Sequence, residues 1–170
     1  MILLNQLKRH TITGILFVLI LGTLSHFFYG WSNNNFFIGL FSPVNESTWE
    51  HMKLLFFPML LFSLITIPKL KQDYPCITSA LLAGILVGTV FIPIIFYTYT
   101  GIVGYDIFIL DLFTFLLAVV IAFYTAYKFT LSCKMQDYVA ILRVIVYVFL
   151  ICFLLFTYSP PSIGLFAVPL

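Results

Sequence analysis

Hydrophobic side chains occur along this chain in five long runs, which short polar segments separate. A transmembrane helix needs about 20 predominantly apolar residues, and each run approaches or exceeds that length. The pattern predicts spans over residues 11–31, 43–67, 76–97, 106–127 and 138–158. We therefore expect an all-α, polytopic membrane helix bundle of about five transmembrane helices, forming a single transmembrane domain over residues 1–170. Ser42 is expected to cap the second helix, with Pro43 as its first helical residue.

Composition supports the same class of protein. Of the 170 residues, 62% are hydrophobic and only 8% are charged, whereas an average soluble domain carries about 25% charged residues. Such a chain cannot build a water-soluble surface, so the lipid bilayer is its expected partner. A homo-oligomer or a partner membrane subunit remains open. Basic residues form no stripe or run, which argues against nucleic-acid binding.

The basic residues also indicate an orientation. With five spans, seven Lys and Arg residues fall on one face and Lys53 alone falls on the other. The seven are Lys8, Arg9, Lys69, Lys71, Lys128, Lys134 and Arg143. Because cytoplasmic loops carry an excess of Lys and Arg, the pattern predicts a cytoplasmic N-terminus and an extracytoplasmic C-terminus.

The three cysteines are scattered along the chain at Cys76, Cys133 and Cys152, with no C-x-x-C pair. In that arrangement a cysteine is typically a small apolar packing residue. We therefore expect no disulfide.

The segment from Ser42 to Lys53 opens the second span and is unusually polar. If it is helical, Glu46 and Glu50 are four residues apart and share a face, which Lys53 continues. The apolar run after Lys53 is too short to cross about 30 Å of hydrocarbon alone. Part of the polar segment is therefore expected to enter the membrane.

His26 and Asp111 are expected at a similar depth below the same face, on the first and fourth spans. Together with Glu50 and His51 they would form one layer of ionisable groups on three helices. Such groups are costly in lipid and should face the protein interior and pair there. Carboxylates and imidazoles that converge are candidate ligands of a divalent metal ion, or a proton relay. The candidate metal ligands are thus His26, Glu50, His51 and Asp111.

Each of these residues also has a structural interpretation. Glu46 near a helix N-terminus would offset the helix dipole, Glu50 and Lys53 would form an ion pair, Asp106 would cap the fourth span, and His26 would bond a neighbouring helix. The wider candidate site for a ligand or ion comprises His26, Asn45, Glu46, Glu50, His51, Asp106 and Asp111.

Familiar catalytic signatures are missing from the sequence. It contains neither an H-E-x-x-H motif nor a G-x-S-x-G elbow. Of the three histidines, His10 falls on the cytoplasmic side. Any metal site within one chain must therefore use carboxylates.

The stretch S-P-V-N-E-S-T-W-E-H-M-K at residues 42–53 resembles the S-P-V-N-E-S-x-W-E-H signature of an uncharacterised bacterial family of small multi-span membrane proteins. The ending Thr157-Tyr158-Ser159-Pro160-Pro161 is similar to that family as well. The resemblance implies a bacterial plasma-membrane protein, from a Gram-positive cell, and brings no activity with it. Members continue beyond this ending with polar residues, which implies truncation at Leu170.

A weaker likeness is to the progestin/adiponectin-receptor and ceramidase superfamily. Asn45-Glu46-Ser47 followed by Trp49 and His51 is similar to its N-E-T…W-x-H stretch. That superfamily implies seven spans and zinc-dependent lipid amidase chemistry. Two of those spans and the later H-x-x-x-H motif are missing here.

Three functions remain open at this point, and whether the protein is an enzyme is undecided. The favoured one is a binding or transport role that uses an acidic, histidine-containing site near the extracytoplasmic face. The second is a metal-dependent membrane hydrolase, with Glu50 or Asp111 as the base. The third is a structural or accessory membrane protein whose polar layer fixes helix packing.

Overall fold

The computed structural model describes residues 2–168 and is built from helices. Within that range, five helices are long and apolar enough to cross a membrane, which confirms the expected all-α architecture. They are α1 (Ile2–Trp31), α3 (Thr48–Leu70), α4 (Ile77–Val103), α5 (Phe108–Ser132) and α6 (Val139–Phe156). The shorter elements are α2 (Phe36–Gly39) and the 3₁₀ turns η1 (Gln136–Tyr138) and η2 (Gly164–Phe166).

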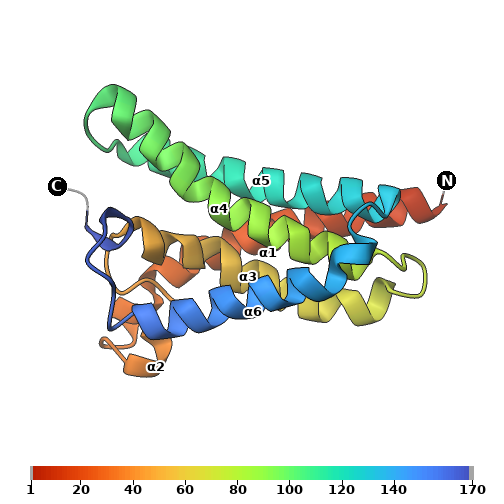
Figure 1. Ribbon diagram of the computed structural model, residues 1–170, viewed down its shortest axis with the longest axis horizontal. Helices are drawn as coiled ribbons and strands as arrows, with labels where there is room; N and C mark the ends of the chain where they lie inside the picture. The colour runs from red at the N-terminus through yellow and green to blue at the C-terminus, as the bar shows by residue number, and fades with distance from the viewer. Residues whose placement is uncertain (1, 169–170) are drawn as a thin grey trace.

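The long helices run back and forth along one direction, so the two chain ends lie at opposite ends of the bundle (Figure 1). The beginning of α1, the ends of α3 and α5 and the beginning of α6 meet at one end, which carries the seven basic residues. We call it the basic end. The end of α1, the beginning of α3 and α2 meet at the opposite end.

The helices extend further than the hydrophobic runs that predict them. Helix α1 begins at Ile2, and α4 and α5 continue to Val103 and Ser132. Helix α1 has 30 residues, a length of about 45 Å against a hydrocarbon core of about 30 Å. A hydrophobic run marks only the part of a helix that suits the hydrocarbon core, whereas the helical hydrogen bonding continues beyond that part.

Helix α3 starts later than expected. It begins at Thr48, with Ser47 as its N-cap, whose side chain accepts a hydrogen bond from the Glu50 backbone nitrogen at 3.4 Å. The expectation that Ser42 caps this helix is wrong, because the Ser42 hydroxyl instead donates to the Ile38 carbonyl at 3.0 Å. The residues before Ser47 therefore form a loop, and they do not share a helix face with the residues after it.

Helices α4 and α5 form the most extensive helix pair of the bundle. Gly84 and Gly88 permit their close approach: a Cβ atom on Gly84 would lie 2.5 Å from the Ala122 carbonyl oxygen, and one on Gly88 would lie 2.6 Å from the Ala122 Cβ. Small residues four apart are typical of tightly packed membrane helices. The contact is made by backbone and small side chains, so it tolerates no added volume.

A disulfide joins Cys76 to Cys133, with Cα atoms 5.3 Å apart. The expectation of no disulfide is therefore wrong. Cys76 precedes α4 and Cys133 follows α5, so the antiparallel packing of these two helices brings the sulfur atoms together. The cysteines are 57 residues apart in sequence, and only the tertiary packing relates them. Cys152 is a free cysteine.

The side chain of Lys53 is fully buried and ties together three parts of the chain. Its Nζ donates to the Glu50 carboxylate at 2.7 Å, to the Thr157 hydroxyl at 2.6 Å and to the Gly39 carbonyl at 3.1 Å. The same Glu50 oxygen accepts from the Val44 backbone nitrogen at 3.0 Å. This group of contacts, the Lys53 clamp, links α3 to the residue after α6 and to the loop before α3.

Substituting Gly84 by Ala is expected to destabilise the bundle by about 1–3 kcal/mol, because the added methyl group collides with the α5 backbone. Thermal unfolding of the detergent-solubilised protein measures the effect. Gly101→Ala is the matched control in the same helix, since nothing lies within 4 Å of a Cβ there. Equal melting temperatures for the two variants would contradict the close α4–α5 contact.

Substituting Lys53 by Met is expected to lower the free energy of unfolding by about 3–5 kcal/mol, because it leaves the Glu50 carboxylate buried without its partner. The double variant Glu50→Gln, Lys53→Met should recover part of the loss, since no lone charge remains buried. Lys71→Met, at an exposed lysine, is the control in the same thermal assay. A Lys53→Met protein as stable as the parent would refute the clamp.

Candidate functional site

Two histidines and a glutamate meet at the end of the bundle opposite the basic end. His26 lies in the last turns of α1, His51 lies in the first turns of α3, and Glu46 lies in the loop just before α3. The Ser47 cap fixes where that loop ends. The antiparallel packing of α1 and α3 then brings the two imidazoles side by side, with ring centroids 5.3 Å apart.

The spacing of the three side chains suits a small metal ion. Glu46 Oε2 lies 3.5 Å from His26 Nε2 and 3.3 Å from His51 Nε2. One ligand atom from each residue lies within 4.8 Å of the other two. In a tetrahedral zinc site with bonds of about 2.0–2.2 Å, ligand atoms lie about 3.3–3.6 Å apart. Both histidine–glutamate distances match that spacing.

His51 is held in the orientation that a ligand needs. Its Nδ1 lies 3.0 Å from the Ser47 carbonyl oxygen, so Nδ1 donates its proton to that carbonyl and Nε2 is the nitrogen that faces Glu46, where it could bind a metal ion once deprotonated. Metal-binding histidines are usually fixed by this kind of second hydrogen bond. Asn45 Oδ1 accepts from the Ser47 backbone nitrogen at 2.9 Å, which stabilises the turn that carries the carbonyl.

Glu46 is the anionic member of the cluster and lies outside the membrane-spanning helices. A hydrogen bond with His51 lowers the pKa of the Glu46 carboxyl below its ordinary value; partial burial opposes this change, and His26 reinforces it. Glu46 is consequently ionised throughout the neutral pH range. A carboxylate that faces two imidazoles attracts cations and completes a nitrogen–oxygen ligand set.

The cluster is accessible from outside the protein. The side chains of His26 and His51 are 31% and 30% exposed, and that of Glu46 is 62% exposed. An open hollow of about 390 Å³ adjoins them, with His26 and Glu46 in its wall beside aromatic side chains that include Trp31. A bound ion would therefore be within reach of a further ligand.

Of the four metal ligands expected from sequence, the structure brings two together and separates the others. His26 and His51 meet, as expected, but the Glu50 carboxylate faces Lys53 in the interior. Asp111 lies outside the cluster, and its Oδ1 accepts a short hydrogen bond from the Tyr99 hydroxyl. The interpretation of Glu50 and Lys53 as an ion pair agrees with this geometry.

The two remaining candidates, Asn45 and Asp106, are both exposed and lie outside the cluster. Asn45 contributes indirectly, because its side chain accepts the hydrogen bond from Ser47 that stabilises the turn. Asp106 is exposed, and α5 begins at Phe108 with Ile107 at its N-cap and no side-chain cap bond. The expectation that Asp106 caps that helix is wrong, because the helix starts one residue too late for it.

The sequence analysis did not include Glu46 among the candidate metal ligands, although it placed Glu46 in the wider site. The reason is the misplaced helix start. A helical Glu46 would share a face with Glu50, whereas a loop residue is free to turn toward the histidines. The signal that was available is the pattern Ser47-x-x-Glu50, which is typical of a helix N-terminus and would have left Glu46 outside the helix.

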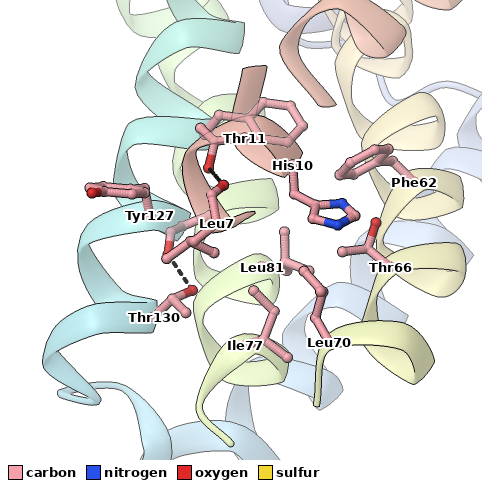
Figure 2. A pocket seen from close by; sticks show the side chains of 12 residues that line it. Leu7, His10, Thr11, Phe62, Thr66, Leu70, Ile77, Leu81, Tyr127 and Thr130 are labelled. Carbon is pink, nitrogen blue, oxygen red and sulfur yellow. Dashed lines mark hydrogen bonds between the residues drawn. The ribbon is translucent and has the colours of Figure 1, made fainter. Parts of the chain in front are cut away.

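A second hollow lies toward the basic end, between α1, α3, α4 and α5, and His10 lies in its wall (Figure 2). Figure 2 shows the His10 ring pointing from α1 toward α3, where Phe62 and Thr66 lie. No carboxylate or cysteine is among the residues that line this hollow. It therefore lacks the ligand set of a metal centre. His10 is the control position for substitutions of the other two histidines.

Comparison with known proteins identifies a family and no activity. The family model of DUF6512, a family of unknown function, matches residues 1–169. No curated protein and no solved structure matches the chain. The expectation of an uncharacterised family is thus confirmed at this level. With its apolar helices, which fit a lipid-embedded protein, this protein belongs to the DUF6512 family.

Proposed function

We propose that this protein is an integral membrane protein of the plasma membrane that binds a divalent transition-metal ion through His26, Glu46 and His51. Zinc is the ion that the ligand set fits best, because zinc accepts imidazole nitrogen and carboxylate oxygen in tetrahedral geometry. The role is that of a binding or transport protein for the cation.

The observation that carries this proposal is the combined spacing and orientation of the three side chains. Two Nε2–Oε2 distances of 3.5 and 3.3 Å match neighbouring ligands of a tetrahedral ion. The contact between His51 Nδ1 and the Ser47 carbonyl directs Nε2 toward the cluster, where it can bind a metal ion after losing its proton. A purely structural ion pair would need neither two imidazoles on one carboxylate nor a fixed tautomer.

The charge distribution supports an extracytoplasmic position for the site. The cluster lies at the end opposite the seven basic residues, which we place in the cytoplasm by the positive-inside rule. Glu46, Asp106 and Asp111 also lie toward this end, while Lys53 is neutralised inside the clamp. A cation arriving from outside would therefore meet an acidic surface. Movement of the ion across the membrane would require a second copy or a partner subunit.

A second candidate function, a metal-dependent membrane hydrolase, is supported by one observation. Three protein ligands leave a fourth position for water in a tetrahedral ion, as in catalytic zinc sites, and the open hollow adjoins the cluster. The likeness of Asn45 to His51 to the ceramidase superfamily points the same way. Asp111, held by Tyr99, is the carboxylate we propose as base in that case.

Zinc titration of the purified, chelator-treated protein is expected to show one site per chain. Because loss of a group that merely orients a ligand costs about 10–100-fold in affinity, His51→Ala and Glu46→Gln should each cost at least that much. Isothermal titration calorimetry, with metal analysis of protein purified without chelator, measures both.

Three control variants make the zinc titration specific. His10→Ala removes a histidine at the far hollow and should leave zinc affinity unchanged. Glu50→Gln should lower stability while zinc still binds, because the glutamine oxygen can still accept from the Val44 nitrogen that anchors the loop. Asp106→Asn should alter neither. Absence of zinc binding in the parent protein would refute the proposal. Loss of zinc with Glu50→Gln but not with Glu46→Gln would refute this choice of ligands.

Zinc affinity is expected to fall between pH 7.5 and pH 5.5, by up to about tenfold per pH unit for each imidazole that must give up a proton to bind the metal. Protonation at the lower pH therefore weakens binding, while the lowered pKa of Glu46 keeps its carboxylate ionised over this range. In His51→Ala one imidazole remains, so affinity should depend less steeply on pH than in the parent protein. A pH-independent affinity would exclude histidine ligands.

A further inference from the structure

The disulfide between Cys76 and Cys133 lies at the basic end of the bundle, away from the proposed metal site. Cys76 is the N-cap residue of α4, and Cys133 is the left-handed residue that ends α5. Basic residues lie close to the cysteines in the sequence, among them Lys128 and Lys134 on either side of Cys133. The same basic residues predict that this end faces the cytoplasm.

We propose that Cys76 and Cys133 form a site of reversible thiol oxidation on the cytoplasmic face of the membrane. Low-molecular-weight thiols and thioredoxins keep cytoplasmic cysteines reduced, and cytoplasmic disulfides are usually transient and redox-sensing. A permanent structural cross-link is the expected form only on the opposite face. This inference is independent of the metal site, because none of its residues belongs to that cluster.

Geometry gives the two sulfur atoms different roles in the exchange. Cys133 is exposed and Cys76 is only 4% exposed, so an incoming thiolate reaches the Cys133 sulfur first. The new bond joins that thiol to Cys133, and the original bond breaks with its electron pair going to Cys76. The departing Cys76 thiolate lies at the N-terminus of α4, where the helix dipole stabilises a negative charge.

A second thiolate completes the reduction. It attacks the small-molecule sulfur of the mixed disulfide and releases Cys133 as a thiolate. The two low-molecular-weight thiols leave as one disulfide, so the two electrons gained by the cysteines equal the two that the small thiols lose. Oxidation runs through the same steps in reverse, with a low-molecular-weight disulfide as the oxidant.

A hydrogen bond between α4 and the turn after α5 keeps the two cysteines near each other when the disulfide is reduced. The Ser79 hydroxyl, on α4, donates to the Gln136 side-chain oxygen at 3.1 Å, and the Gln136 backbone nitrogen donates to the Cys133 carbonyl at 3.0 Å. The first bond holds the turn after α5 against the beginning of α4 without the disulfide, and the second bond links Gln136 to Cys133 within that turn. The reduced thiols therefore stay close enough to pair again.

The test labels thiols in living cells that express the full chain in a Cys152→Ser background. Acid quenching followed by a maleimide-polymer label and gel electrophoresis counts the free thiols per chain. We expect two labels in unstressed cells, none after the thiol oxidant diamide, and two again after the oxidant is removed. Cys76→Ser and Cys133→Ser in the same background should each show one label in unstressed cells, and any label that diamide removes from them is held in a mixed disulfide with a low-molecular-weight thiol.

Two outcomes would overturn the proposal. A pair that resists labelling in unstressed cells is a permanent cross-link; if a membrane-impermeant phosphine then exposes both thiols in intact cells, this end faces the outside. A pair that stays labelled after diamide, while a cytoplasmic control protein is oxidised in the same cells, does not form the bond in the membrane.

Discussion

The buried charge of Lys53 is the constraint on which the candidate site depends. Moving an ammonium group out of water costs several kcal/mol even after relaxation, unless good hydrogen bonds and an opposite charge offset the cost. Lys53 meets this requirement with a carboxylate, a hydroxyl and a backbone carbonyl, from Glu50, Thr157 and Gly39. Because these partners come from three segments, satisfying one charge fixes the relative positions of all three.

The clamp also decides which acid is available to a metal. The Glu50 carboxylate is committed to Lys53 and to the Val44 backbone nitrogen, and it is buried. Anchoring Val44 in turn fixes the loop that carries Glu46, which remains more than half exposed and faces the two histidines. A purely electrostatic view would treat the two glutamates as equivalent. The hydrogen bonds separate them into a residue that positions the loop and a residue that can bind.

The helices could be predicted from sequence because a run of some twenty apolar residues has no other stable form in lipid. The details that define the site could not, since they depend on loop hydrogen bonds and on packing between distant segments. Whether Glu46 joins α3 is decided by the Ser47 cap, and the partner of Asp111 is a tyrosine on another helix, Tyr99. The Cys76–Cys133 bond reflects close α4–α5 packing, for which Gly84-x-x-x-Gly88 was the available signal.

Helix α6 connects the two ends of the molecule, and few of its side chains are buried. Between its ends only Val146 and Phe153 are buried, so its position depends on what holds each terminus. The disulfide and the Ser79 contact hold the turn before it, and Thr157, in the Lys53 clamp, holds the residue after it. Spatial continuity alone does not establish coupling; that requires an element with two arrangements of similar free energy. Helix α6 therefore provides a physical connection between the disulfide and the clamp: it is held at both termini, and most of its side chains between them are not buried.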